Sequence, residues 1–303
     1  MKRFAALLLP GAAGIAALAF AMPTQRPVAS PAEIIAAAPA GDWRPIPADR
    51  LLVMDLAPDA AGGGRQVGSE RAPPPVSAPW VANIRALAGA GYWDGLAIDR
   101  VQDNYVVQWG APNDGRTPPA GLGKVAQDDY RVAAKDVDWR AKGADPYARR
   151  TGFYRGWAVA GDNAAMWPVH CYGAVGVGRE LPPDAGNGAE LYAVIGHAPR
   201  HLDGNIALVG RVVDGMEHLS SLPRGHGELG FYTKEEVKTP IRRIAVASAL
   251  PVAERPKLES LDPGSGSFKA LIGARENRRD PFFLRPAGGA DICNLPVPVR
   301  RAP

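Results

Sequence analysis

The chain has 303 residues, of which 35 are glycine and 30 are proline, so roughly a fifth of it favours loops and turns. Low-complexity disorder begins at about 25–30 % of these residues, and the 46 % of hydrophobic residues is enough for a sizeable core. The formal net charge is +4, and two of the positive charges, Lys2 and Arg3, lie at the very start. The remaining excess is too small for the dense basic surface that nucleic-acid binding needs, so no nucleic-acid partner is expected.

The first 21 residues have the layout of a secretory signal peptide. Lys2 and Arg3 precede an apolar run from Phe4 to Phe20, and the small residues Ala19 and Ala21 favour cleavage after Ala21. The alternative, an uncleaved anchor, is disfavoured because the run has about 17 residues, whereas a span needs roughly 20. Residues 1–21 are therefore interpreted as a signal peptide. We expect the mature protein to be exported, in the periplasm, and without stable membrane insertion.

Residues 22–90 are predicted to contain a linker, two strands and one helix. Residues 22–47 are rich in proline and alanine without periodicity, which predicts a linker. Leu51–Leu56 is a short apolar strand, and a second strand is expected around residues 66–67 within a Gly/Pro-rich stretch. From Pro79 to Ala90, proline opens and glycine closes a run with helical spacing of three apolar residues, namely Trp80, Ile84 and Leu87. This pattern predicts a helix.

Beyond residue 91 the periodicity becomes β-like. The expected strands are short, rich in Val, Ile, Tyr or Ala, and mostly bounded by turn residues: Gly95–Val101, Tyr105–Gly110, Phe153–Ala160, Tyr172–Gly178, Leu191–Ile195, Ile206–Val213 and Ile241–Ala247. Many short strands without βαβ alternation predict a mainly β fold, as an antiparallel barrel or sandwich. We expect one domain over 48–250 and a C-terminal extension over 251–303, which begins as a polar exit segment and has one more helix over 267–279.

The cysteines and histidines restrict the site chemistry. Cys171 and Cys293 form one disulfide across a loop of about 120 residues, or remain two free buried thiols, and the sequence leaves both alternatives open. His197 and His201 have the spacing of a helical metal pair, but Pro199 between them disfavours a helix. Complete phosphate-loop, dinucleotide and nucleophile-elbow motifs are not found, so no metal or cofactor is expected.

Two blocks of sequence carry most of the functional information. The first is YWDGLAIDRV at Tyr92–Val101 with NYVVQWG at Asn104–Gly110, and the second is NGAELY at Asn187–Tyr192, HLDG at His201–Gly204 and VGRVVDGM at Val209–Met216. In order and in most spacings they resemble the cyclophilin family of peptidyl-prolyl cis-trans isomerases, and ANIRAL at Ala82–Leu87 is similar to that family's first helix. The resemblance spans roughly residues 50–248. It implies an eight-stranded antiparallel barrel capped by two helices, and proline-containing polypeptides as substrates.

The resemblance also implies roles for individual residues. Arg100 matches the catalytic arginine, and Gln108 matches the glutamine that orients it and contacts the substrate backbone. Four residues stand at positions of the proline pocket: Tyr105, Val106, Tyr192 and Leu202. Glu190 replaces a substrate-contacting glutamine, and His201 takes the place of a tryptophan at the pocket rim.

Several positions depart from the family pattern. Asp99 replaces a histidine, Trp109 replaces a glycine, Ile206 replaces a pocket histidine, and residues 178–179 are Gly-Arg where the family has Ala-Asn. Glu190 is expected to be able to pair with Arg100 and compete with the peptide. The long separation between Gln108 and the strand at residue 172 predicts an inserted loop around residues 111–150.

Two functional hypotheses follow. The first is an exported, monomeric peptidyl-prolyl isomerase that acts on cell-envelope proteins, with Arg100 catalytic. The second is a cyclophilin-like module that binds proline-containing segments or a partner protein with little activity. A pocket blocked by Glu190 and Trp109 favours binding alone, whereas an open apolar cup beside Arg100 favours catalysis.

Overall fold

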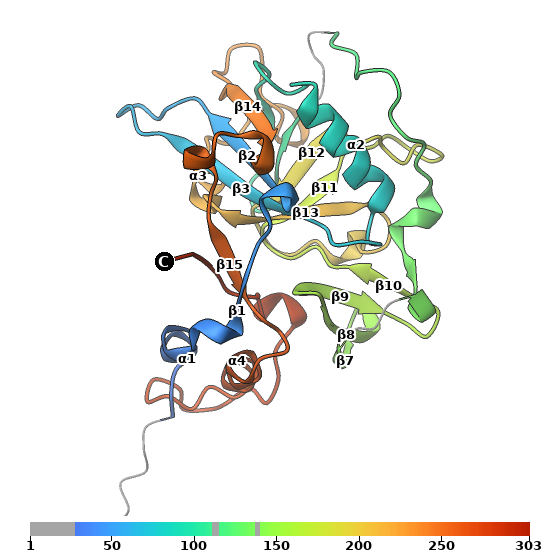
Figure 1. Cartoon of the computed structure of the whole chain (residues 1–303). Coiled ribbons are helices and arrows are strands. Elements are labelled where there is room, and N and C mark those ends of the chain that lie inside the picture. The colour runs from blue at the N-terminus through green and yellow to red at the C-terminus, as the bar shows by residue number, and fades with distance from the viewer. Residues whose placement is uncertain (1–27, 111–114, 137–139) are drawn as a thin grey trace, which may run out of the picture.

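The computed structural model describes residues 28–110, 115–136 and 140–303, so the interpreted signal peptide lies outside the described residues. The described part contains three antiparallel sheets and four α-helices. Figure 1 shows the largest sheet with helix α2 (Ala78–Gly89) in the upper part of the molecule and the elements of the two chain ends below it. The expected mainly β architecture is confirmed.

The largest sheet is a nearly closed eight-stranded barrel. Its strands follow in space the order β14 (Ile241–Val246), β2 (Leu51–Leu56), β3 (Arg65–Arg71), β13 (Leu208–Asp214), β11 (Ala174–Val177), β12 (Leu191–Val194), β5 (Val106–Trp109) and β4 (Ile98–Val101). The two edges meet through the Ile98 N–H, which donates to the Thr239 carbonyl at 2.9 Å, and the Ile241 N–H, which donates to the Leu96 carbonyl at 2.7 Å. The barrel expectation is therefore confirmed over the sandwich.

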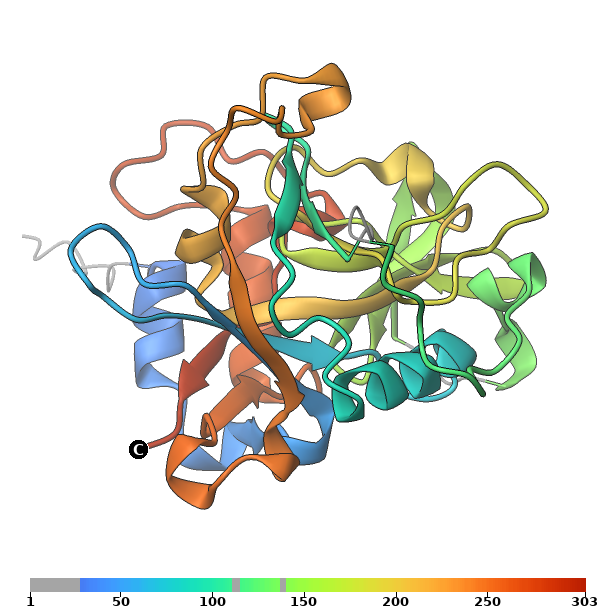
Figure 2. The ribbon, with the colours of Figure 1, turned by 90° about the horizontal axis from the view of Figure 1, so that it is seen from above.

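Two helices cover the barrel core. In α2 the three apolar residues expected on one face, Trp80, Ile84 and Leu87, are all essentially inaccessible to solvent. They share the main hydrophobic cluster with Leu219 of α3 (Met216–Ser220). Figure 2, viewed from above, shows α2 lying along one side of the barrel. Among the helices of the described ranges, none is long and apolar enough to cross a bilayer.

The segment expected as an inserted loop around residues 111–150 contains the first strands of a second sheet, which continues to residue 168. Its five strands follow the order β6 (Val132–Ala133), β10 (Ala165–Pro168), β9 (Trp157–Gly161), β8 (Ala148–Tyr154) and β7 (Arg140–Asp145). The single strand predicted over Phe153–Ala160 is wrong, because Arg155 and Gly156 have φ of 46° and 83° and form the tight turn of the β8–β9 hairpin. A turn at Arg-Gly is hard to recognise from sequence, because Asn-Gly or Asp-Gly is the usual signal.

The two chain ends fold together beside the barrel. Strands β1 (Trp43–Pro45), β15 (Leu258–Leu261) and β16 (Val299–Arg301) form the third sheet, and α1 (Pro31–Ala37) packs against α4 (Gly266–Glu276) (Figures 1 and 2). The linker prediction for residues 22–47 is therefore wrong from residue 31 onward. Ser30 and Glu33 form a capping box at the start of α1, and Trp43 is buried. The helix expected over 267–279 is confirmed as α4.

A second hydrophobic cluster joins the chain ends to the inserted sheet. Phe153 of β8 and Trp167 of β10 pack with Phe268 and Leu271 of α4 and with the C-terminal segment around Ile292. In the same region Cys171 and Cys293 form a disulfide, which settles the alternative that the sequence left open. The C-terminal extension is thereby fastened to the residues directly before barrel strand β11.

Candidate functional site

Arg100 is held firmly at the edge of the barrel. It lies on β4 opposite Gln108 of β5, and its Nη1 donates to Gln108 Oε1 at 2.9 Å. Its Nε donates to the Leu229 carbonyl at 2.7 Å, and its Nη2 donates to Gln102 Oε1. Because a guanidinium has five N–H groups and three have partners among the described residues, two remain to meet a ligand.

The surroundings of Arg100 are partly apolar. Its guanidinium carbon lies 5.6 Å from the ring centre of Tyr105 and 5.3 Å from that of Phe231. Burial lowers the pKa of Arg100 from its ordinary value, while Tyr105 and Glu190 act in the opposite direction. An arginine stays charged at neutral pH in such a setting, so the site presents an oriented cation.

Gln108 connects Arg100 to Glu190. Its Oε1 accepts from Arg100, and its Nε2 donates to Glu190 Oε1, so both ends of the amide are fixed. Burial raises the pKa of Glu190, and the hydrogen bond from Gln108 acts to lower it. The direct pairing expected between Glu190 and Arg100 is not what the hydrogen bonds show, because Gln108 lies between them and leaves the free side of the guanidinium open.

Beside Arg100 lies an open pocket of 140 Å³ with an apolar wall. Seven of the eight residues expected at the site line it, together with four others: Arg100, Tyr105, Val106, Gln108, Glu190, Tyr192 and Leu202, with Val177, Gly178, Arg179 and Ile206. Val106 and Tyr192 belong to a small hydrophobic cluster on which Tyr105 and Ile206 pack. The apolar cup and the cation therefore occupy one site.

His201 is the expected site residue that the structure does not bring to the pocket. It lies in the same short turn, Arg200–Leu202, as Leu202, but its side chain is exposed and does not line the cavity. In a turn that advances by about a third of a circle per residue, adjacent side chains point in different directions. Leu202 therefore faces the pocket and His201 faces solvent.

Two departures from the family pattern leave the pocket clear. Trp109 is buried in the main core of the barrel and does not line the pocket. Asp99, at an irregularity of β4, does not line the pocket either, and its carboxylate pairs with Lys238 Nζ at 3.1 Å. Trp109 does not line the pocket, and Glu190, which does, is bonded to Gln108 and leaves a cavity of 140 Å³, so the observation that discriminates the two hypotheses favours catalysis.

The sequence motifs do not indicate the groups that hold Arg100 from outside its strand pair. Gln102, the carbonyl of Leu229 and the ring of Phe231 come from turns without a motif. The glycine at position 230 is the one sequence feature that indicates this close packing, because a Cβ there would lie 2.7 Å from the Gln102 Cα. Only glycine allows that contact.

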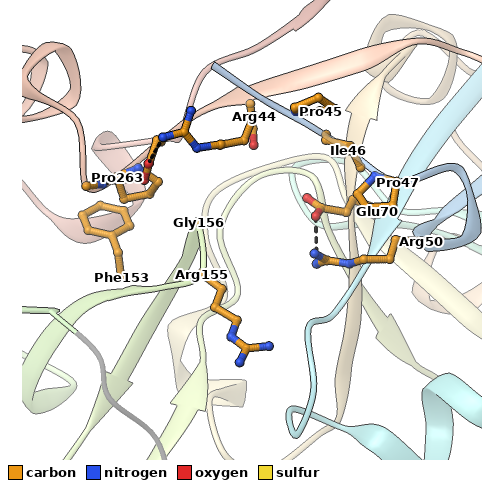
Figure 3. Close-up of a pocket in the computed structure, with 13 residues that line it drawn as sticks. Arg44, Pro45, Ile46, Pro47, Arg50, Glu70, Phe153, Arg155, Gly156 and Pro263 are labelled. Carbon is orange, nitrogen blue, oxygen red and sulfur yellow. Dashed lines mark hydrogen bonds and ion pairs between the residues drawn. The ribbon is translucent and has the colours of Figure 1, made fainter. Parts of the chain in front are cut away.

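A larger cavity of 380 Å³ lies elsewhere, where the chain ends meet β3 and the β8–β9 turn (Figure 3). It contains none of the expected site residues. Arg50 pairs with Glu70 at 2.8 Å and Arg44 pairs with Asp262 at 3.1 Å, so much of its charge is neutralised internally. Within the described ranges, no group of three or more His, Cys, Asp or Glu side chains is arranged to hold a metal ion.

Comparisons with known proteins bear on the family and the fold of this chain. A family model described as cyclophilin type peptidyl-prolyl cis-trans isomerase/CLD matches residues 76–247. Among solved structures, the cyclophilin AquaCyp293 from Hirschia baltica matches with a TM-score of 0.64 and 21 % identity, over 85 % of this chain and 92 % of that chain. A cyclophilin type peptidyl-prolyl cis-trans isomerase from Cryptosporidium parvum, crystallised in the presence of the dipeptide Ala-Pro, matches with a TM-score of 0.37 and 13 % identity, over 64 % of this chain and 98 % of that one.

No curated protein matches the chain. The family model covers more than half of the sequence and includes both Arg100 and the pocket residues. The chain therefore belongs to the cyclophilin-type peptidyl-prolyl cis-trans isomerases.

Proposed function

We propose that this isomerase accelerates rotation about X-Pro bonds in exported polypeptides, and that Arg100 stabilises the twisted amide while the apolar cup holds the proline ring. The observation that carries the proposal is a guanidinium fixed by three hydrogen bonds, with two N–H groups left, beside an open pocket with an apolar wall. No nucleophile, metal or cofactor is needed for this chemistry.

The physical requirement is to lower a rotational barrier. Resonance in an X-Pro amide gives a barrier of about 18–20 kcal/mol, and unaided rotation takes tens of seconds or longer. At the twisted transition state the resonance is lost and the prolyl nitrogen regains a lone pair. A fixed donor that binds this nitrogen, or holds the twisted peptide's carbonyl, stabilises the transition state more than either planar ground state.

The other residues have supporting roles in this proposal. Gln108 keeps Nη1 of Arg100 in place, so the cation does not have to reorganise during rotation. Tyr105, Val106, Tyr192 and Leu202 form the cup that holds the ring while the preceding residue turns. Glu190 fixes the other end of the Gln108 amide.

Two features support the exported location in this proposal. Residues 1–21 have the pattern of a signal peptide. The Cys171–Cys293 disulfide fits an oxidising compartment such as the periplasm, since disulfides seldom persist in a reducing cytosol. A fusion of residues 1–40 to a reporter enzyme that works only after export tests this part, and a reporter that stays inside the cell contradicts it.

The catalytic part is tested with an NMR exchange or protease-coupled assay on an Ala-Pro peptide. We expect acceleration by the wild type and a loss of about 10²–10³-fold in Arg100→Ala, as for other donors that stabilise a transition state. Arg149→Ala, an exposed arginine on β8, is the matched control and keeps full activity.

Three results would contradict parts of the proposal. A folded wild type that binds the peptide without acceleration supports the binding-module hypothesis instead. Activity that survives in Arg100→Ala removes Arg100 from its catalytic role. An equal loss in Arg149→Ala shows that overall charge, and not the position of Arg100, is responsible.

A further inference from the structure

A buried chain of polar side chains begins at the floor of the proline pocket and runs away from it. The Tyr192 hydroxyl lies 2.9 Å from His170 Nε2, and His170 Nδ1 lies 2.9 Å from Asp203 Oδ1. His170 is 0 % exposed, and the Asp203 side chain is 5 % exposed. Of these three residues only Tyr192 lines the pocket, so His170 and Asp203 have no place in the chemistry described above.

The partners determine where the protons lie. Asp203 Oδ1 accepts hydrogen bonds from both the backbone N–H and the Nδ1 of His170, so the imidazole proton is on Nδ1 and Nε2 is an acceptor. The Tyr192 hydroxyl, whose pKa is raised by burial, stays protonated and donates a hydrogen bond to His170 Nε2. The hydroxyl is thereby committed to the interior, and the ring faces the pocket as an apolar wall.

The ring of Tyr192 is also confined from the neighbouring strand. Gly176 of β11 stands opposite Tyr192 of β12, and a Cβ on Gly176 would lie 2.2 Å from both Cζ and Oη of the tyrosine. The ring therefore rests on bare backbone, with its tip tied to His170. Both constraints act on the tip of the side chain, where a small shift would alter the shape of the cup.

The chain of contacts continues into parts of the molecule outside the barrel. Asp203 Oδ2 accepts from Nε of Arg200, and Nη1 of Arg200 donates to Asp145 at 2.7 Å and lies 3.5 Å from Asp291. The Arg200 side chain is 2 % exposed. Asp145 ends β7 of the inserted sheet, while Asp291 belongs to the C-terminal extension, where it accepts from the N–H of Cys293. Cys293 is bonded to Cys171, which directly follows His170.

We propose that His170 is a positioning residue of this isomerase, which fixes the pocket floor through Tyr192 and is itself held, through Asp203 and Arg200, by the inserted sheet and the C-terminal extension. The proposal rests on the proposed function, because it assigns Tyr192 to the proline cup. It also gives the insertion and the extension a role at the active site, although Asp145 and Asp291 do not line the pocket.

The test uses two substitutions of His170, each of which retains one of its two side-chain hydrogen bonds and removes the other. In His170→Asn the side-chain amide lies near the former Nδ1 and can still donate to Asp203, but it is too short to reach Tyr192. In His170→Gln the amide lies near the former Nε2 and can accept from Tyr192. We expect His170→Asn to raise KM for the Ala-Pro peptide about tenfold with little change in kcat, and His170→Gln to stay within about threefold of the wild type.

A double-mutant cycle with Tyr192→Phe separates positioning from general stability. If His170 acts through the tyrosine hydroxyl, His170→Asn changes KM by less than about twofold once that hydroxyl is absent. Circular dichroism and unfolding by urea establish that each variant is folded under assay conditions. Peptide affinity is measured by NMR titration in parallel, so that binding is observed independently of turnover.

The results have distinct meanings. If His170→Asn has the same effect with Tyr192 intact as in the Tyr192→Phe background, or if His170→Gln is as impaired as His170→Asn, the positioning role is overturned while the isomerase function stands. A wild type that binds the peptide but does not accelerate it overturns the proposed function, and the affinities then still test the positioning of the cup. A wild type that neither binds nor accelerates overturns both.

Discussion

On one side of the proline pocket, Arg100 and Gln108 come from adjacent strands of the barrel, and Glu190 directly precedes a third. Two N–H groups of the arginine have no partner among the described residues. On the other side, the hydroxyl of Tyr192 is committed to His170, and the contacts continue inward to groups that are almost fully buried. The side with Arg100 therefore keeps hydrogen-bond donors available for a substrate. On the other side, the Tyr192 hydroxyl is already bonded to the protein interior.

This difference follows from what each side has to do. A group that stabilises a transition state needs spare hydrogen-bonding capacity directed at the substrate. A wall that holds a ring needs a fixed position, and buried polar contacts supply it at the cost of desolvating charges. Substitutions on the buried side should therefore affect stability and binding first, and those on the open side should mainly affect turnover.

The largest effect is expected from Arg200→Met. The arginine is buried between the carboxylates of Asp203 and Asp145, and its loss leaves these buried negative charges without their cation, which costs about 3–5 kcal/mol. Urea unfolding measures this as a lower midpoint. Arg44→Met is the control, because the Arg44–Asp262 pair is largely exposed and should contribute at most about 1 kcal/mol. Equal losses of stability in the two variants would show that the buried polar contacts of Arg200 contribute no more than an exposed ion pair.

Removing the disulfide should have the next largest effect. Replacing Cys171 and Cys293 with serine releases a loop with a sequence separation of 122 and should lower stability by about 2–4 kcal/mol. We also expect a higher KM with an unchanged kcat, because both cysteines adjoin the contacts that hold His170. Wild type treated with reductant should reproduce the variant. A change in kcat alone would place the effect on the open side of the pocket instead.

A pair of glycine substitutions compares the two sides directly. Gly176→Ala puts a methyl group into the Tyr192 ring, whose displacement should lower kcat/KM about 10²-fold. Gly178→Ala puts its Cβ 2.7 Å from the Cγ and Cδ of Glu190, a side chain that can move aside, so we expect less than about a tenfold loss. Kinetics on the Ala-Pro peptide measure both. A greater loss in Gly178→Ala would reverse the assignment of the rigid side.

The two sides also differ in how far the sequence predicts them. Arg100 and Gln108 lie opposite each other in a strand pair whose two strands belong to one sequence block. The order of the blocks correctly predicts that Val106, Tyr192 and Leu202 line the pocket. The barrel strands and α2 were likewise expected, since local periodicity determines them. His201 was misplaced because two neighbouring residues in one short turn point to different surroundings, which a motif does not distinguish.

The buried side was not foreseen because its contacts cross the fold. His170 is 33 residues from Asp203 and 22 from Tyr192, and Arg200 reaches Asp145 across 55 residues. The folded terminal segment was missed for the same reason, since β1 pairs with β15 more than two hundred residues away. Composition predicts a linker over residues 22–47, whereas the structure has α1 and β1 there, with Trp43 buried against the C-terminal extension.

The smallest effect is expected from Glu190→Gln, and its sign depends on pH. Burial raises the pKa of Glu190 above its ordinary value of 4.5, so the folded state holds this proton more tightly than the unfolded state does. Below that value both states are protonated and the group has no effect, but as the pH rises above 4.5 toward the folded-state pKa the wild type loses stability. The variant lacks this titration, so the melting temperature of Glu190→Gln minus that of the wild type should increase between pH 4 and pH 8. Exposed Glu235→Gln is the charge control and should show no such increase. A difference in melting temperature that is constant or falls with pH would mean that the hydrogen bond from Gln108 outweighs the burial of Glu190. The ionised carboxylate of Glu190 would then cost the folded state no stability.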